Sequence, residues 1–296
     1  MAGSRREGRS IAGVAYAAAA YLTWGLFPLY FRALAGVPAP EVLAHRIVWS
    51  LVFLAALVTA LRRWRGVAAQ LRSPGTMVTL AVTAVLISSN WLTYIWAVNS
   101  GRVLEASLGY FVNPIVTVLL GVVFLREPLT PRQVAAVGLA AAGVLVLVVN
   151  AGRVPWVALA LAFTFGLYGL LRKRVPIEAV AGLLGEVGVL APLALLYLAT
   201  LPAGHFGAAP RHTALLAASG VVTALPLIWF AQGVRRLRLS TIGLLQYLNP
   251  SLQFAIAVFL FGEHFTAAHG VAFGCIWASL AIYTAEALSA ARRQAG

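Results

Sequence analysis

Long apolar runs alternate with short polar connections along the whole chain. Ten runs approach the roughly 20 residues that an α-helix needs to cross a bilayer. They lie at about 11–31, 38–61, 76–98, 103–125, 131–150, 154–171, 177–200, 212–234, 240–261 and 267–289. The connections are short, so the pattern predicts an all-α polytopic membrane protein with ten transmembrane helices and no soluble domain.

One stretch of the chain occurs twice. A shift of 136 residues aligns the segment 102–138 with a later one, without a gap. The matches include Arg102 with Arg238, Leu108 with Leu244, Asn113 with Asn249, Pro114 with Pro250, Glu127 with Glu263 and Gly138 with Gly274. A match of this length indicates an internal repeat. We therefore divide the chain into a basic tail at 1–10, five-helix repeats at 11–150 and 151–289, and a second tail at 290–296.

The basic residues predict the orientation. With the N-terminus in the cytoplasm, 17 Lys and Arg residues fall in cytoplasmic segments and 4 in outer loops. Cytoplasmic loops of membrane proteins carry this excess, so both termini are expected inside. Because each repeat has an odd number of helices, the two repeats are predicted to be inverted relative to each other.

Composition supports a membrane class and narrows the chemistry. The 296 residues are 61% hydrophobic and only 10% charged, well below the roughly 25% charge of soluble domains. The net charge of +14 lies in clusters between apolar runs, which is a topology signal rather than a nucleic-acid signal. With one Cys and no Asp, no disulfide framework, metal site or cofactor is expected.

Asn-Pro pairs interrupt two of the apolar runs, at Asn113-Pro114 and Asn249-Pro250. A proline removes one backbone hydrogen bond and clashes with the preceding turn, so each helix is expected to kink or break there. Paired interrupted helices at matching places in two repeats are typical of a transporter's binding site. The alternative is that each pair only bends its helix for packing.

Arg46 and Glu186 are the charges placed deepest in the runs, in corresponding helices of the two repeats. Ionisable groups inside a membrane are costly and are candidates for function. Arg46 is a candidate for binding helix carbonyls or a substrate carboxylate. Glu186 is a candidate proton carrier, as is Glu105. A direct Arg46–Glu186 ion pair and purely structural charges remain alternatives.

Further polar and aromatic side chains are candidates for one shared cavity. With the charged Arg46 and Glu186, they are Asn90, Tyr94, Tyr110, Trp229, Gln232, Gln246 and Tyr247, and Asn113 and Asn249 at the kinks. Polar groups in a span should face protein or cavity rather than lipid. Amide and aromatic groups together suit an amphipathic organic substrate better than a bare ion. A fainter echo, between 23–27 and 164–168, is interpreted as packing around Gly25 and Gly166.

Several motifs resemble a known family. They are Thr23-Trp24-Gly25, Ala44–Ser50, Asn90-Trp91, Leu104–Phe111, Tyr168–Lys173, Arg236–Thr241 and Gln246-Tyr247. From about Gly13 to Trp277 the chain is similar to the RarD branch of the EamA-type drug/metabolite transporters, whose members are often labelled chloramphenicol-sensitive proteins. The resemblance implies a ten-helix carrier of two inverted five-helix repeats in the bacterial inner membrane.

The sequence therefore predicts a secondary transporter that exports a small amphipathic metabolite or drug by alternating access. A passive permease or channel is the alternative. An intramembrane enzyme is disfavoured because the chain has no G-x-S-x-G, no H-E-x-x-H and no Asp. No Walker-type loop is present, so ATP is not the direct energy source. The expected partners are a small molecule and the lipid bilayer, with a homodimer as a further hypothesis and no nucleic acid.

Overall fold

The computed structural model describes residues 2–99, 103–152, 156–260 and 266–295. The side chains of 2–10, 98–99, 103–108, 151, 257, 283–284 and 287–295 lie outside this description. The described residues form helices and no strand. The helices are α1 (Ala2–Gly25), α2 (Phe27–Ala33), α3 (Ala39–Ala60), α4 (Trp64–Leu71), α5 (Pro74–Asn99), α6 (Val103–Leu125), α7 (Pro131–Ala151), α8 (Trp156–Arg174), α9 (Ala179–Thr200), α10 (Pro210–Arg236), α11 (Leu239–Leu245), α12 (Leu248–Phe259) and α13 (Ala267–Ala295).

The helices follow the predicted apolar runs, which confirms the all-helical class. Eight runs each fall on one long helix, whereas the first falls on α1 and α2 and the ninth on α11 and α12. By length and hydropathy, seven helical segments in the described part could cross a membrane, and two shorter apolar helices accompany them. The count of ten crossings stays a prediction.

Large apolar side chains remain exposed on the outer helices. Val149, Leu193 and Val123 are each at least 65% exposed, on α7, α9 and α6 respectively. Lipid tails solvate such side chains as well as a protein core does, whereas water would not. The exposed surface of the bundle is therefore suited to a bilayer.

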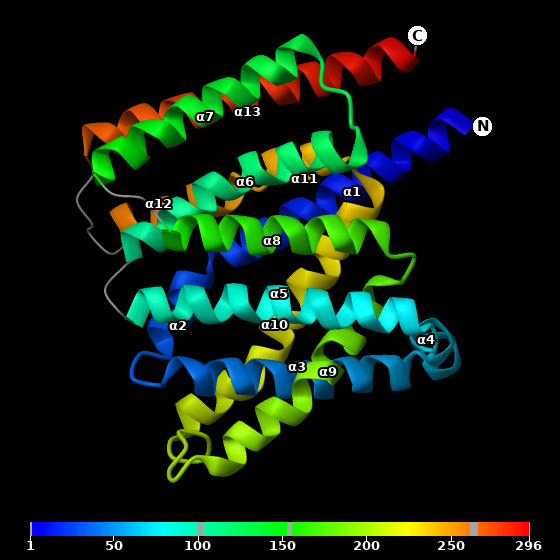
Figure 1. Cartoon of the computed structure of the whole chain (residues 1–296), viewed down its shortest axis with the longest axis vertical. Helices are drawn as coiled ribbons and strands as arrows, with labels where there is room; N and C mark the ends of the chain where they lie inside the picture. Colours follow the sequence, from blue (N-terminus) through cyan, green and yellow to red (C-terminus); the bar gives the residue numbers. More distant parts are fainter. Residues whose placement is uncertain (1, 100–102, 153–155, 261–265, 296) are drawn as a thin grey trace.

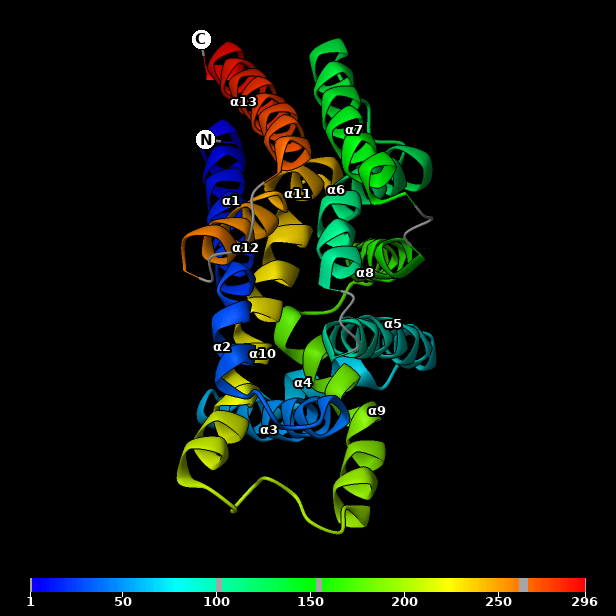
Figure 2. The same ribbon diagram turned by 90° about the vertical axis from the view of Figure 1, so that its left-hand side faces the viewer.

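Helix contacts occur in matched sets. α1 packs on α10 as α5 packs on α8, and α3 packs on α10 as α5 packs on α9. The contact of α6 with α8 likewise corresponds to that of α12 with α1. The helices α7 and α13 lie side by side at one edge of the bundle (Figures 1 and 2). In both views, α1 begins and α13 ends at the same end of the molecule.

The two Asn-Pro helices differ in continuity, and the kink expected at Pro114 stays a prediction. The helix α6 is continuous through Pro114. The ninth run is instead interrupted at Gln246-Tyr247, and α12 begins two residues before Pro250. A proline ring clashes with the carbonyl four residues earlier, which for Pro250 belongs to Gln246. That carbonyl accepts instead from the Asn249 N–H at 3.1 Å. The break therefore precedes Pro250 rather than coinciding with it.

The ninth run is in direct contact with α6 through its first part, α11. A Cβ atom added to Gly243 on α11 would lie 2.8 Å from the carbonyl oxygen of Pro114 on α6. Only a glycine allows this close approach of the two backbones. The contact holds the break in the ninth run beside the middle of α6, where several predicted site residues lie.

Helix ends are fixed by specific caps. Thr130 and Gln133 form a capping box at the start of α7 with Pro131 at its first position, as expected for this sequence. Glu127, three residues before Thr130, caps a different helix, α11. Its carboxylate accepts from the N–H groups of Leu239 and Ser240, at 2.8 and 2.9 Å, at the start of α11.

Glu127 is also the centre of a charge cluster. Lys173 lies 3.3 Å and Arg238 4.0 Å from its carboxylate oxygens. Burial alone would raise the pKa of Glu127, but the Ser240 and Leu239 N–H donors and the Lys173 charge outweigh it and lower the pKa. The cluster ties the ends of α6, α8 and α10 to the start of α11.

Candidate functional site

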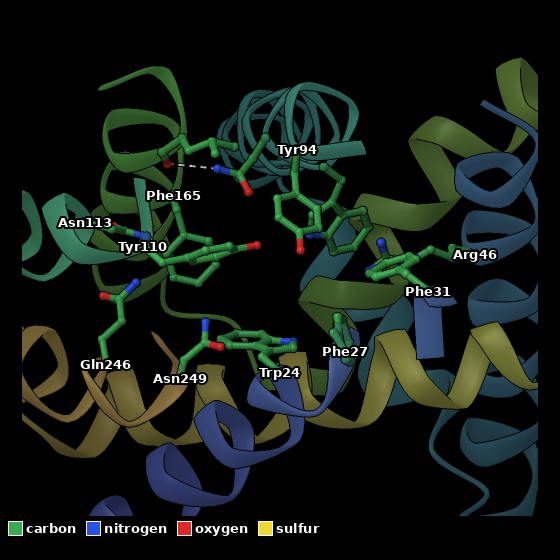
Figure 3. A pocket seen from close by; sticks show the side chains of 13 residues that line it. Trp24, Phe27, Phe31, Arg46, Tyr94, Tyr110, Asn113, Phe165, Gln246 and Asn249 are labelled. Atoms are coloured by element: carbon green, nitrogen blue, oxygen red, sulfur yellow. Dashed lines mark hydrogen bonds between the residues drawn. The ribbon is translucent and has the colours of Figure 1, made fainter. Parts of the chain in front are cut away.

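A cavity lies where helices of both repeats meet. It encloses an empty space of about 540 Å³, including its solvent-open part. Its walls come from α1, α2, α3, α5, α6 and α8 and from the α11–α12 junction (Figure 3). The lining residues are Trp24, Phe27, Phe31, Arg46, Asn90, Trp91, Tyr94, Tyr110, Asn113, Leu161, Phe165, Gln246 and Asn249.

The internal repeat supplies matched pairs to this lining. Asn113 and Asn249 occupy equivalent repeat positions, as do Tyr110 and Gln246. All four line the cavity, and the two asparagines and Gln246 are at most 4% exposed. The structure therefore brings the two Asn-Pro segments to one site.

Hydrogen bonds hold several of the amide side chains. The Asn90 amide on α5 donates to the Leu161 carbonyl and the Thr164 hydroxyl on α8, both at 2.8 Å. The Asn249 carbonyl oxygen accepts from the Gln253 amide at 2.8 Å. Because a buried amide without a partner is costly, these bonds fix the side-chain orientations. Two helices of different repeats are thereby joined beside the cavity.

Aromatic rings form most of the remaining wall. Trp24 and Phe165 meet edge to face with ring centroids 5.5 Å apart, and Tyr94 and Tyr110 meet at 5.4 Å. Such edge-to-face pairs are favourable and hold each ring in place. The hydroxyl groups of both tyrosines point into the open space in Figure 3. The wall thus combines apolar faces with a few polar ends.

Arg46 enters the cavity from α3 and is the charged residue of its lining. It is 3% exposed, and its Nε–H donates to the Thr223 hydroxyl at 2.8 Å. The guanidinium carbon lies 4.2 Å from the Trp91 ring centre and 5.7 Å from those of Phe27 and Phe31. The aromatic faces stabilise the cation without neutralising its charge.

Glu186 lies outside this lining, so it forms no shared network with Arg46. Its carboxylate accepts from Thr83 at 2.7 Å and Tyr168 at 3.3 Å, and it lies 3.5 Å from an Arg172 nitrogen. Arg172 belongs to the basic cluster at 172–174, at the end of an apolar run, but it is only 4% exposed. A local cation at the end of α8 therefore satisfies Glu186, and a direct Arg46–Glu186 pair is absent from the described ion pairs.

Three other predicted residues do not line this cavity. Gln232 bonds to the Arg236 guanidinium on the outside of α10. Trp229 packs against the main apolar core, and Tyr247 is buried in a second core cluster beside α7 and α13. Trp229, Gln232 and Tyr247 are therefore absent from the described cavity lining, although Gln246 beside Tyr247 belongs to it. The Glu105 side chain lies outside the described residues.

The sequence did not identify the aromatic lining residues Trp24, Phe27, Phe31, Trp91 and Phe165 as site residues. An aromatic side chain in an apolar run gives no signal of its own, because it fits a core or a lipid-facing surface equally well. One signal was available. Trp24 and Phe165 occupy matching places in the echo between 23–27 and 164–168, and they meet across the cavity wall.

A bundle of membrane-length apolar helices around a polar and aromatic cavity is the architecture of a multi-pass membrane transporter. The EamA-like transporter family matches residues 11–149. The uncharacterized transporter YojE of Bacillus subtilis is 46% identical over 92% of this chain and 93% of its own length. Protein RarD of Salmonella typhimurium is also 46% identical, over 95% of this chain and 97% of its own length. The chain therefore belongs to the RarD branch of the EamA-like transporter family.

The overall architecture has a counterpart among solved structures. A crystal structure of another protein superposes with a TM-score of 0.70 at 22% sequence identity, over 97% of this chain and 98% of that one. At this identity the likeness concerns the fold alone. It extends over essentially the whole helical bundle, including the helices that line the cavity.

Proposed function

We propose that the protein is a secondary transporter that exports a small amphipathic organic molecule by alternating access. Ten helices cross the bacterial inner membrane as two inverted repeats, with both termini in the cytoplasm. The observation that carries the proposal is the cavity lined by equivalent residues of both repeats, Tyr110 with Gln246 and Asn113 with Asn249. A site built on such pairs is accessible from either side when the repeats exchange conformations.

The packing of the helices supports the inverted arrangement. The matched contacts α1–α10 with α5–α8, and α3–α10 with α5–α9, are those that a pseudo-twofold axis between the repeats would produce. The start of α1 and the end of α13 lie at one end of the molecule, which fits an even number of crossings (Figure 1). The excess of basic residues in the connections assigned to the cytoplasm favours that side for both.

Two polar contacts would act as gates in this mechanism. On the predicted cytoplasmic side, Glu127 holds α11 against the ends of α6 and α8. On the predicted outer side, the Glu41 carboxylate accepts from the His205 backbone N–H at 2.6 Å, which ties α3 to the α9–α10 connection. Alternating access requires that one of these contacts opens while the other stays closed.

Counterflow in proteoliposomes tests the proposal. Purified protein is reconstituted in vesicles loaded with an unlabelled solute, and uptake of the same labelled solute is followed. A carrier gives transient accumulation that saturates with concentration, because loaded carriers exchange across the membrane. Linear, non-saturating flux for every solute would favour a passive permease or channel and contradict the proposed mechanism.

Topology is tested separately, since Cys275 is the one cysteine of the chain. In a Cys275→Ala background, single cysteines are placed at Gln70 and at Gly207 and treated with a membrane-impermeant maleimide in intact cells. We expect labelling from outside at 207 and not at 70, because these connections lie on opposite predicted sides. Labelling of both from outside would contradict the ten-helix arrangement.

Proton coupling through Glu186 or Glu105 remains a hypothesis. The partners of Glu186 described above favour a structural role, since Arg172 already balances its charge. The double variant Glu105→Gln with Glu186→Gln tests the idea in the counterflow assay at several pH values. Unchanged transport with an unchanged pH dependence would exclude both residues as proton carriers.

A further inference from the structure

Arg46 has no carboxylate partner among the described residues, although it is deeply buried. The sequence contains eight acidic residues, all of them Glu. Five have described side chains, and each is paired with a different basic side chain, which for Glu41 is a histidine. These pairs are Glu41 with His205, Glu127 with Lys173, Glu178 with Arg63, Glu186 with Arg172 and Glu286 with Arg132.

The hydrogen bonding of Arg46 leaves its two terminal nitrogens available. Nε donates to Thr223, and within the described part of the chain the two terminal nitrogens donate to no side chain or carbonyl. A guanidinium presents these nitrogens as a planar fork that matches the two oxygens of a carboxylate. Arg46 lines the cavity at one side of the open space in Figure 3, and a bound anion there would complete the arrangement.

A buried cation without an anion is costly, and the protein offsets only part of that cost. The Trp91 face at 4.2 Å supplies a cation–π contact, but it leaves a full positive charge at the cavity wall. The other polar lining groups are neutral amides and hydroxyls. The cavity is therefore electropositive at one end, and the missing charge has to come from its ligand.

The rest of the wall defines the body of that ligand. Trp24, Phe165, Tyr94 and Tyr110 present rings on the sides of the space, and flat apolar groups stack favourably against such rings. None of the described lining residues is a carboxylate that could pair with an ammonium group. This argues against amines and against zwitterions, which would bring a cation of their own.

We propose that the cavity binds an aromatic organic acid, with its carboxylate paired to the Arg46 guanidinium and its ring between the aromatic side chains of the wall. The inference rests on the proposed function, because it names the substrate class for the same cavity. It makes charge selectivity, rather than size alone, the main discriminating property of the transporter.

The experiment compares ligands that share one ring and differ in charge. Binding of indole-3-acetate, indole-3-acetamide, tryptamine and tryptophan to the purified protein is measured by isothermal titration calorimetry. A charge-assisted pair in a buried site should make the acid bind about tenfold to a hundredfold more tightly than the amide. The amine and the zwitterion should bind no better than the amide.

Substitution of Arg46 tests whether this residue sets the preference. In Arg46→Gln the ratio of the affinity for the acid to that for the amide ligand should fall to about one, because glutamine keeps a hydrogen-bond donor but has no charge. Arg46→Lys should retain part of the preference, since it keeps the charge without the fork. Arg63→Gln, at an exposed position, is the matched control and should leave the ratio unchanged.

Several binding outcomes would overturn the inference. In the wild-type protein, these are binding of the amide, amine or zwitterion as tight as that of the acid, or no binding of any of the four ligands. In the variants, they are an acid preference kept in Arg46→Gln, or one lost in Arg63→Gln as fully as in Arg46→Gln. If Arg46→Gln does not give a monodisperse helical protein, Arg46→Lys carries the test alone, and an unchanged ratio there counts against the inference.

Counterflow with the same ligands separates the two proposals. Acid-selective binding without saturable counterflow of any ligand would contradict the transport mechanism and leave the site intact. Saturable counterflow of tryptamine or the amide but not of the acid would support a carrier and overturn the assignment of the substrate class. Counterflow of the acid that is lost in Arg46→Gln supports both.

Discussion

Arg46 and Arg172 are buried to nearly the same extent, 3% and 4% exposed, in opposite surroundings. Arg172 lies 3.5 Å from the Glu186 carboxylate and donates to the Ala179 carbonyl, so its charge is used within the protein. Arg46 has a hydroxyl and aromatic faces around it and lines a cavity. Burial alone therefore does not distinguish a structural charge from one available to a ligand, but the partner does.

The comparison also shows where the repeat symmetry ends. Arg46 and Glu186 lie in corresponding helices of the two repeats, yet only Arg46 lines the cavity. The neutral lining residues keep the symmetry, as in the pair Asn113 and Asn249. Under the proposed mechanism, the paired neutral residues would allow access from either side, and the single charge would fix the orientation of the ligand.

The largest expected effect comes from breaking the Arg172–Glu186 pair. Arg172→Gln should lower the free energy of unfolding by about 3–5 kcal/mol, because it leaves a carboxylate buried without its cation. Thermal or chemical unfolding in detergent measures the change. The double variant Arg172→Met with Glu186→Met should recover most of the loss. A double variant as unstable as the single one would show that the pair is not what holds α8 and α9.

The next largest effect is expected at Glu127. Glu127→Gln should cost about 1.5–3 kcal/mol, since the carboxylate accepts charge-assisted bonds from the N–H groups of Leu239 and Ser240. Because its pKa is lowered in the folded protein, its contribution is present above about pH 4.3 and is lost as the pH falls toward the lowered pKa. The variant should therefore flatten the acid limb of a stability–pH profile, and equal slopes for both proteins would contradict this.

A smaller effect on stability is expected from Arg46→Gln. The lost Thr223 hydrogen bond and cation–π contact destabilise, but removal of a buried cation without an anion stabilises, so the net change should stay within about 1 kcal/mol. The same unfolding assay as for Arg172→Gln makes the comparison direct. A loss as large as that of Arg172→Gln would mean that Arg46 is a structural charge.

The smallest effect is expected from Arg63→Gln at the surface. The Arg63–Glu178 pair is 3.0 Å long, but its side chains are 57% and 43% exposed. Solvent-exposed ion pairs contribute about 0.2–1 kcal/mol and weaken with salt. Unfolding at low and high ionic strength should show a small difference that disappears with added salt. A large loss that persists in salt would indicate that α4 and the start of α9 depend on this contact.

Part of the site could be predicted from the sequence because polar groups are costly in a membrane. Asn90, Asn113, Asn249 and Arg46 stand out in apolar runs for that reason, and all four line the cavity. The same rule misplaced Glu186, because its partner Arg172 comes from a basic cluster that reads as solvent-exposed. The rule also cannot detect Trp24 or Phe165, since an aromatic side chain costs nothing in lipid, core or cavity.

The sequence by itself determined the helical membrane class, the helix positions and the equivalence of the two Asn-Pro segments. These follow from local hydrophobicity and from an internal repeat, both of which are properties of the chain alone. Only the tertiary structure decided that α6 stays continuous while the ninth run breaks before Pro250. It also decided that Glu186 pairs with Arg172, whereas Arg46 lines the cavity without a carboxylate partner among the described residues. Those features depend on contacts between side chains of helices that are far apart in the sequence. The hydrophobic periodicity of each helix does not specify such contacts.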